Sequence, residues 1–304
     1  MTILADENNR VIVQGITGDI GSVQTKLMLE YGTRIVAGVT PGKGGQSIHD
    51  IPIYNTVKET LLEHEADGSI LFVPASRVLN AAKEAIDARI EMLVIITEHV
   101  PVHDTLKVKA EAQKQGVTVL GPNTPGIISP GKTKMGIMPG NLYRPGNVGI
   151  VSRSATLAYE IAGNLTEAGI GQSTCAGIGG DRVTGVTFVD LLKLFDKDDE
   201  TSIVVLIGEV GRTVEEEAAD YIGKEFSKPV VAYIVGRTAP PEKKMGHAGA
   251  IIERGRGTAE SKIEAFRRAG VSVITRPSEV VSCVEEALKA VSYTHLTLPT
   301  NREV

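Results

Sequence analysis

Several features that are common in other protein classes are scarce in this chain. Its 304 residues include no tryptophan, two cysteines and 4% aromatic side chains. Cys175 and Cys283 lie far apart in the sequence, which argues against a disulfide-stapled secreted domain and favours reduced thiols in a cytoplasmic protein. A net charge of −5 gives no electrostatic reason to expect binding to nucleic acid or to an anionic membrane.

Long apolar runs are missing too. None approaches the roughly 20 residues that cross a bilayer, and the sequence before Val11 carries no signal or transit pattern. Glycine, by contrast, is abundant, with 33 residues. A chain of this length forms one or two domains and buries about 75% of its unfolded surface. The composition is typical of an α/β enzyme with many tight backbone turns.

The first part of the chain alternates between short β-branched runs and amphipathic segments. This alternation predicts a parallel sheet covered by helices on both faces. The predicted strands are 10–13, 34–39, 68–73, 92–97 and 117–120, and the predicted helices are 20–31, 57–65, 77–88 and 104–115.

A second alternation follows a Pro- and Gly-rich stretch, 122–146, which we interpret as a connection. The sequence therefore predicts two doubly wound α/β domains. Residues 292–304 fit neither pattern and resemble a non-native tail, so they are excluded from the fold prediction. In the second domain we expect strands at 148–151, 173–178, 202–207, 229–235 and 271–275, and helices at 156–168, 187–195, 213–226, 258–269 and 278–290.

A glycine-rich turn follows the first predicted strand. Gly15, Gly18 and Gly21 let the backbone approach a ligand, and the helix that follows offers free N–H groups to a phosphate. The spacing is not G-x-G-x-x-G, and strand 34–39 lacks the acid typical of NAD sites. Lys43, in the next glycine-rich turn, suits the 3′-phosphate of coenzyme A or the 2′-phosphate of NADP. The alternative is a turn that serves only helix packing.

A histidine lies between small residues in the segment from Met245 to Ile252. Neutral imidazole is basic near pH 7, so His247 is a candidate nucleophile; a loop histidine without a role is the alternative. Glu209 ends a strongly apolar predicted strand, and the carboxyl ends of such strands carry the sites of α/β proteins. We expect its carboxylate to accept a hydrogen bond from His247 and to fix the ring tautomer.

The predicted strand 148–151 also runs into a turn and a helix. Ser154, Ala155 and Thr156 would offer backbone N–H groups and hydroxyls to a phosphate, unless Ser154 or Thr156 serves only as a helix cap. Farther along, residues 215–217 are three successive glutamates, which we expect to form a solvated first turn of helix.

Two motif matches are weaker than they look. Residues 126–133 satisfy G-x-x-x-x-G-K-[ST], but Pro130 and the glycines that follow argue against a phosphate loop that opens a helix. His99 and His103 have the i, i+4 spacing of zinc ligands, but Pro101 between them predicts a strand end and helix cap instead. We expect no metal site in this chain.

Taken in order, these motifs closely resemble the α subunits of succinate–CoA ligases (succinyl-CoA synthetases) over about residues 1–290. The resemblance implies a Rossmann-like CoA-binding domain over 1–121, the connection 122–146, and a flavodoxin-like ligase domain over 147–291. The motifs that carry it are 15–21, 40–45, 121–123, 148–154, 177–181, 208–209 and 246–250.

The resemblance also implies roles for individual residues. His247 becomes the phosphohistidine and Glu209 the acid that supports it. Tyr159 matches a substrate-contacting position that a β subunit completes, and 154–156 match the phosphate-binding turn. The implied CoA contacts are Thr17, Gly18, Asp19, Ile20, Lys43, Ile96, Thr97 and Glu98. The chain departs from the family's common pattern at Ala155 (usually Gly), Thr124 (usually Cys) and Arg212 (usually small).

The implied activity is a reaction of the tricarboxylic acid cycle, in which succinate, CoA and ATP or GTP are interconverted with succinyl-CoA, ADP or GDP and phosphate. The sequence has no convincing nucleotide site, so we expect nucleotide and Mg²⁺ on a β subunit, in an αβ or α₂β₂ assembly. Two alternatives are a malate–CoA ligase α subunit and a non-catalytic CoA- or NAD-responsive binding protein.

Overall fold

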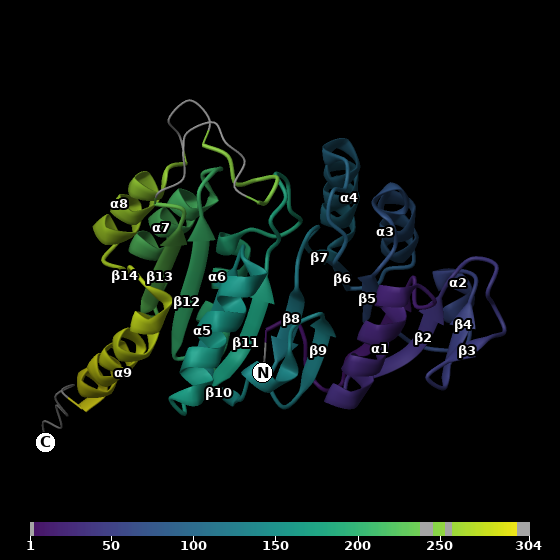
Figure 1. The fold of residues 1–304 in the computed structure, drawn as a ribbon, viewed down its shortest axis with the longest axis horizontal. Coiled ribbons are helices and arrows are strands. Elements are labelled where there is room, and N and C mark those ends of the chain that lie inside the picture. The colour runs from purple at the N-terminus through teal and green to yellow at the C-terminus, as the bar shows by residue number, and fades with distance from the viewer. Residues whose placement is uncertain (1–2, 238–245, 253–256, 297–304) are drawn as a thin grey trace, which may run out of the picture.

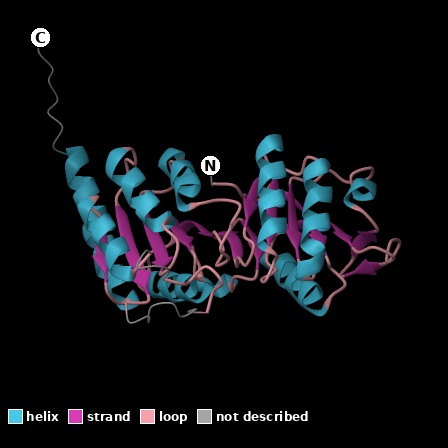
Figure 2. Ribbon diagram, turned by 90° about the horizontal axis from the view of Figure 1, so that it is seen from above, coloured by secondary structure: helices cyan, strands magenta, loops and turns pink. Residues whose placement is uncertain are grey.

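The computed structural model describes residues 3–237, 246–252 and 257–296. In this part of the chain, the strands form two sheets of seven. The sheets belong to two α/β halves that lie side by side along the long axis of the molecule (Figure 1), and helices cover both faces of each (Figure 2). The predicted α/β class with two doubly wound units is confirmed.

The first sheet is parallel except for its outermost strand, β3, which pairs antiparallel to β4. The six parallel strands have the spatial order 3-2-1-4-5-6, the order of a Rossmann fold. The strands, in spatial order, are β3 (Ser47–Ile48), β4 (Ile51–Tyr54), β2 (Arg34–Val39), β1 (Arg10–Gln14), β5 (Gly68–Leu71), β6 (Met92–Ile95) and β7 (Thr118–Leu120). The helices are α1 (Asp19–Tyr31), α2 (Val57–Thr60), η1 (Ala75–Arg77), α3 (Val78–Asp87) and α4 (Val102–Gln115).

The second sheet has five parallel strands in the flavodoxin-like order 2-1-3-4-5, extended by an antiparallel hairpin, β8–β9. Its strands, in spatial order, are β14 (Ser272–Ile274), β13 (Val230–Val235), β12 (Ile203–Glu209), β10 (Pro145–Ser152), β11 (Gln172–Gly177), β8 (Gly126–Ser129) and β9 (Thr133–Gly136). The helices are η2 (Gly140–Leu142), α5 (Ala155–Glu167), α6 (Phe188–Lys197), α7 (Val214–Lys224), α8 (Ala259–Arg268), η3 (Pro277–Glu279) and α9 (Val280–Leu296).

The hairpin β8–β9 lies inside the stretch that the sequence predicts to be a connection. Gly126 and Gly136 face each other across it with φ of +100° and +151°, and a Cβ at either would lie within 2.1 Å of a backbone oxygen. These glycines therefore permit close strand pairing, although the Pro- and Gly-rich composition of the segment resembles that of a loop. The short strands β3 and β4 were also missed, and α2 is shorter than predicted. Helix α9 continues to Leu296, so the start of the predicted tail is helical; residues 297–304 lie outside the described residues.

The two halves share a packed junction. A single cluster of buried apolar side chains contains Val11 and Val94 from the first sheet and Ile127 and Val204 from the second. Backbone hydrogen bonds cross the junction as well: Val186 N–H donates to the Val119 carbonyl at 2.9 Å, and Gly185 N–H donates to the Gly121 carbonyl at 2.9 Å. The loop before α6 is thereby held against β7, and the loops that follow several strands of both sheets come together.

Candidate functional site

His247 lies in the loop between β13 and α8, with its side chain 30% exposed. The loop is seated closely on the one that follows β11: Gly249 N–H donates to the Gly180 carbonyl at 3.0 Å. A Cβ at Gly180 would lie 2.5 Å from Cγ of the histidine ring, so only glycine leaves room for the ring here. Met245, at the start of the predicted loop, lies outside the described residues.

Glu209, the last residue of β12, faces His247. Its carboxylate oxygens lie 2.9 and 3.0 Å from Nδ1 of the ring, as the sequence predicts, and its side chain is 6% exposed. An acceptor at Nδ1 assigns the ring proton to that nitrogen and leaves the lone pair of the neutral ring on Nε2. The hydrogen bond to Glu209 raises the pKa of His247, while partial burial opposes that rise.

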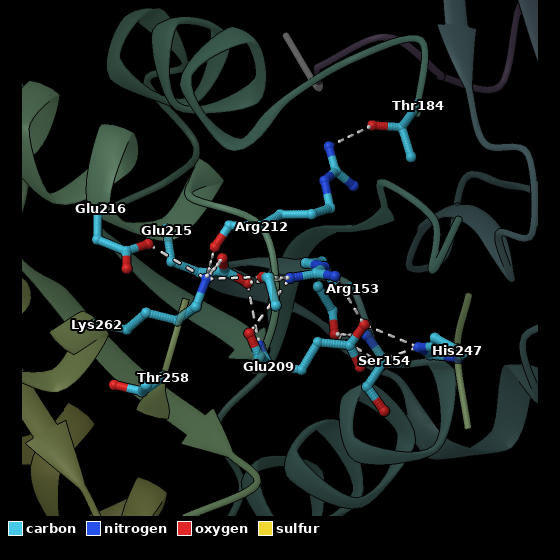
Figure 3. A network of polar contacts seen from close by, with 12 residues as sticks. Arg153, Ser154, Thr184, Glu209, Arg212, Glu215, Glu216, His247, Thr258 and Lys262 are labelled. Atoms are coloured by element: carbon cyan, nitrogen blue, oxygen red, sulfur yellow. Dashed lines mark hydrogen bonds and ion pairs between the residues drawn. The ribbon is translucent and has the colours of Figure 1, made fainter. Parts of the chain in front are cut away.

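Behind Glu209 is a buried network of charges that the sequence did not reveal. Figure 3 shows the Glu209 carboxylate between His247 and Arg153, a residue of the turn before α5. Arg153 Nη2 is 3.2 Å from Glu209 Oε1, and Nη1 is 2.8 Å from Glu215 Oε1. Glu215 also pairs with Lys262 of α8. The side chains of Arg153, Glu215 and Lys262 are each 0% exposed.

The prediction that residues 215–217 form a solvated first turn of helix is wrong for Glu215. Glu217 is exposed, but Glu215 lies on the buried face of the helix together with Ala219 and Ile222. Lys262 lies likewise on the buried face of α8, beside Ile263. A charged residue on the apolar face of each of two adjacent helices indicates an internal ion pair. In the sequence, the run of three glutamates obscured this pattern.

The N-terminus of α5 is close to Arg153 in the chain. Ser154 is the N-cap, its Oγ accepts a hydrogen bond from Leu157 N–H at 3.4 Å, and the residue is 8% exposed. Ala155 is half-buried and Thr156 is exposed. The expected strand–turn–helix is confirmed, and Ser154 acts as a cap; a role for 154–156 in phosphate binding stays a prediction.

The predicted CoA turn forms the expected opening of α1. Gly15 has a φ of +83°, and a Cβ at Gly21 would lie 2.2 Å from the Gly15 carbonyl oxygen, so the helix starts directly against the turn. Gly18 is the N-cap and has no side chain to satisfy the first N–H groups. Gly18, Asp19 and Ile20 are exposed, whereas Thr17 is half-buried and donates to Thr40 Oγ1 at 3.3 Å.

Two further segments carry the remaining predicted CoA contacts. Lys43 is exposed in a turn after β2, where Asn55 Oδ1 accepts hydrogen bonds from the N–H groups of Gly42 and Gly44 at 2.9 and 3.1 Å. The segment 96–98 follows β6; its first two residues are half-buried and its third, Glu98, is exposed. The Thr97 hydroxyl donates to the Val73 carbonyl at 2.6 Å.

A chain of hydrogen bonds connects this segment with the histidine loop. Asn123 N–H donates to the Thr97 carbonyl at 2.9 Å, and the Asn123 carbonyl accepts from Gly180 N–H at 3.0 Å. The side chain of Asn123 donates to Asp181 Oδ1 at 3.1 Å. Burial raises the pKa of Asp181, and the hydrogen bond from Asn123 opposes that rise. The ends of β6, β7 and β11 therefore meet beside His247.

Tyr159 lies one turn into α5 and packs against a buried cluster that includes Tyr143 and Cys175. Among the described residues its buried hydroxyl has no hydrogen-bond partner. Burial raises the pKa of Tyr159 to about 12 and that of Cys175 to about 12. The predicted contact of Tyr159 with substrate stays a prediction.

Two of the departures from the family pattern have defined contacts. The Thr124 hydroxyl donates to the Gly177 carbonyl at 2.7 Å and accepts from Gly126 N–H at 3.0 Å. Arg212 has a φ of +60° and donates to the Asp181 carbonyl at 3.0 Å. Burial lowers the pKa of Arg212 to about 10, and the nearby Arg153 adds to that decrease.

The two weak motif matches take the forms that the prolines indicate. Residues 126–133 run through β8 into β9, so a strand and not a helix follows the G-K-T sequence. Pro101 is the N-cap of α4. In the described parts of the chain, no group of three or more His, Cys, Asp or Glu side chains is arranged to hold a metal ion. None of the described helices has both the length and the apolar character to cross a membrane.

Comparison with known proteins identifies the family. Residues 6–99 match the model of the CoA binding domain, and residues 151–272 match that of the CoA-ligase domain. The α subunit 2 of the ADP-forming succinate–CoA ligase of Archaeoglobus fulgidus is 57% identical over 288 residues, which cover 95% of this chain and 100% of the relative. The chain belongs to the family of succinate–CoA ligase α subunits.

Other members of this family match as completely. The α subunit from Methanothermobacter thermautotrophicus is 57% identical and covers 94% of this chain and 97% of its own length. The α subunit from Staphylococcus aureus is 51% identical, and the match covers 99% of this chain and 100% of the relative. A solved ATP citrate lyase from Methanothrix soehngenii, in complex with citrate and coenzyme A, is 25% identical with a TM-score of 0.87. The match covers 99% of this chain but 53% of that one, so the α-subunit fold spans about half of the lyase chain.

Proposed function

We propose that this chain is the α subunit of an NDP-forming succinate–CoA ligase. In this role it interconverts succinate, CoA and ATP or GTP with succinyl-CoA, ADP or GDP and phosphate. The observation that carries the proposal is the contact of Glu209 with His247 Nδ1, which leaves Nε2 as the nucleophilic nitrogen. Identity of 51–57% to succinate–CoA ligase α subunits over almost the whole chain supports the choice of reaction.

CoA is assigned to the first domain, residues 1–121. The uncapped start of α1 is exposed at Gly18, and its free N–H groups suit a phosphate of CoA. Gly21 keeps α1 against the turn, where any side chain would collide with the backbone. We assign Lys43 to a further phosphate, and 17–20 and 96–98 to the rest of the CoA contacts.

The chemistry has two steps in the direction that phosphorylates the protein. A phosphate oxygen attacks the thioester carbon of succinyl-CoA, the C–S bond breaks, and CoA leaves as the thiolate. Nε2 of His247 then attacks the phosphorus of the resulting succinyl phosphate, and the P–O bond to the acyl oxygen breaks to release succinate. Glu209 stabilises the positive charge that develops on the ring through Nδ1–H. The α5 N-terminus, including 154–156, is assigned to the phosphoryl group, and Tyr159 to the succinate side.

The proposed reaction also needs a partner chain. We propose that a β subunit binds the nucleotide with Mg²⁺, which supplies charge neutralisation for the phosphates, and that it completes the succinate site. Because the nucleotide then lies on another chain, the loop that carries His247 has to move between the two sites. The assembly is αβ or α₂β₂.

The test is phosphoryl labelling of the αβ complex. Succinyl-CoA with labelled phosphate, and separately labelled ATP or GTP with Mg²⁺, should each label this chain once per α subunit. A phosphoramidate on imidazole is labile in acid and stable in base, so the label should disappear in acid. It should be absent in His247→Asn and reduced in Glu209→Gln.

Label that survives acid, or that persists in His247→Asn, would mean that the proposed chemistry is wrong. Competition between succinate and malate in the ATP- or GTP-dependent reaction then establishes which acid is the substrate. If malate competes better than succinate, the assignment passes to a malate–CoA ligase. Tight CoA binding without any labelling would favour the non-catalytic binding protein.

A further inference from the structure

Arg153 contacts Glu209 at more than its carboxylate. Besides the ion pair at 3.2 Å between Nη2 and Oε1, Nη1 donates to the Glu209 main-chain carbonyl at 3.3 Å and to the Gly211 carbonyl at 3.0 Å. The main-chain N–H of Glu209 donates to Glu215 Oε1 at 3.1 Å, the same oxygen that accepts from Arg153. Arg153 and Glu215 together therefore hold both the backbone and the carboxylate of Glu209.

Lys262 fixes the outer side of this network. Its Nζ donates to the carbonyls of Gly211 and Arg212 at 3.0 and 3.1 Å, pairs with Glu215, and lies 3.2 Å from Glu216 Oε2. The loop that follows β12 is thus anchored to α8 (Figure 3). Close packing continues to the histidine loop, because a Cβ at Gly211 would lie 2.3 Å from the Gly249 carbonyl oxygen.

Such a network is a costly way to stabilise a fold. Desolvation of buried charges consumes much of their attraction, and apolar side chains of similar volume are often as stable. The guanidinium of Arg153 is not fully hydrogen-bonded: among the described residues, its buried Nε has no hydrogen-bond partner, and its buried Nη2 meets Glu209 Oε1 as an ion pair without a hydrogen bond. What the guanidinium adds is a fixed positive charge on one oxygen of the carboxylate that also faces His247.

We propose that Arg153 is a positioning residue for the phosphohistidine. Held by Glu215, it fixes the orientation of Glu209 and shares the negative charge of that carboxylate with His247. The inference deepens the proposed function and rests on it. Glu209 alone would favour the protonated ring, which has no lone pair on Nε2 and cannot attack phosphorus; Arg153 counteracts this effect and keeps more of the ring in the nucleophilic, neutral form.

The charged groups that act on His247 come from three segments: Glu209 from the end of β12, Arg153 from the turn after β10, and Asp181 from the loop after β11. Glu209 and Asp181 raise the pKa of His247, and Arg153 lowers it. Removal of the Arg153 charge should therefore raise this pKa further, so that the neutral fraction at a given acidic pH falls.

The experiment compares pH profiles of the intact αβ complex. Arg153→Met combined with Glu215→Gln removes one positive and one negative charge, so that the buried Glu215 carboxylate is not left without its arginine partner. Lys262 keeps Glu216 Oε2 at 3.2 Å. The single-turnover rate of labelling by succinyl-CoA and labelled phosphate is measured from pH 5.5 to 8.5. We expect the acid limb to move to higher pH by roughly half a unit or more. Arg153→Lys, which keeps the charge but not the fork of donors, should move it less.

A second readout reports on the ring itself. In ¹⁵N-histidine-labelled complex, with His247→Asn to assign its signals, the titration of His247 should move in the same direction as the rate profile. Arg268→Met serves as the control, because Arg268 is exposed on α8 and its ion pair within the described part of the chain is with Glu264 at 3.9 Å. It should leave both curves unchanged.

The outcomes separate this inference from the proposed function. If the double variant is labelled at His247 but both its pH curves match those of the parent, Arg153 does not act on the histidine and the inference is wrong, while the proposed function stands. If His247→Asn still accepts label, the proposed function itself is wrong. If the double variant fails to fold, the titration of Arg153→Gln, which removes the charge but keeps polar donors, decides: a curve that coincides with that of the parent overturns the inference.

Discussion

The two helices that open the candidate sites begin in opposite ways. Helix α1, at the predicted CoA turn, has glycine as its N-cap, no side-chain cap on its first N–H groups among the described residues, and two exposed residues, Asp19 and Ile20, at its start. Helix α5, next to the histidine site, is capped by its own Ser154, which is 8% exposed and follows the fully buried Arg153. Both follow a parallel strand through a tight turn.

The difference separates two uses of a helix N-terminus. At α1 the free N–H groups are left for a ligand to satisfy, so the site is an open binding surface. At α5 part of that capacity is used within the chain, and the turn is tied to the ion pairs around Glu209. We infer that α1 is built to receive a phosphate-bearing molecule, whereas α5 is built to keep reacting groups in place. The following variants test this contrast.

The largest effect is expected at Gly21. A Cβ there would lie 2.2 Å from the Gly15 carbonyl, which is backbone and cannot turn away. Gly21→Ala should lower the free energy of unfolding by about 1–3 kcal/mol and weaken CoA binding, as followed by denaturant unfolding and calorimetry. Gly163 of α5 is the matched control, since its Cβ would meet only Leu142 Cδ2 at 3.9 Å; Gly163→Ala should stabilise by up to about 1 kcal/mol. Changes of equal size and sign would contradict the close fit at Gly21.

A smaller effect is expected at Ser154. Ser154→Ala removes the cap of α5 and should cost about 1 kcal/mol of folding stability. Thr187, which caps α6 by accepting from Asp190 N–H at 3.3 Å, gives a matched cap variant. Thr187→Ala should cost a similar amount, but only Ser154→Ala should slow the labelling of His247. Equal labelling rates would remove Ser154 from the reacting site.

The smallest change in stability is expected when the N-terminus of α1 is given a side-chain cap. Gly18 has a φ of −74° and a ψ of 155°, which serine adopts, and its Cβ would meet the Gly15 oxygen at 3.4 Å. Gly18→Ser should therefore stabilise the protein by a few tenths of a kcal/mol. The new hydroxyl would compete with CoA for the same N–H groups, so calorimetry should give a higher Kd. An unchanged Kd would show that these N–H groups do not bind CoA.

Much of the fold followed from the sequence, because the strands of a doubly wound sheet are buried on both faces. In β12 all seven residues are buried, and the apolar run at that point predicts the strand directly. The antiparallel hairpins gave no such signal. Strand β4 contains Pro52, and β8–β9 depends on Gly126 and Gly136, residue types that normally end strands.

The candidate site was predictable where it depends on the ends of strands. Glu209 and His247 were expected to meet because both follow strands of one parallel sheet. Arg153 was not singled out, since a charged residue after a strand is most often solvated. Its burial depends on Glu215 and Lys262, which come from two other helices, and no local pattern around Arg153 announces a contact between residues 62 positions apart.

The backbone contacts between the halves have a consequence for handling the protein. Strand β7 is the last strand of the first sheet, and the loop at 185–186 donates two hydrogen bonds to the segment at its end. A fragment that stopped after Gly121 would leave these carbonyls and the edge of β7 open to pairing with another copy. The second half thus covers the exposed edge strand of the first half. A truncated CoA-binding fragment should therefore aggregate unless it carries a substitute for that loop.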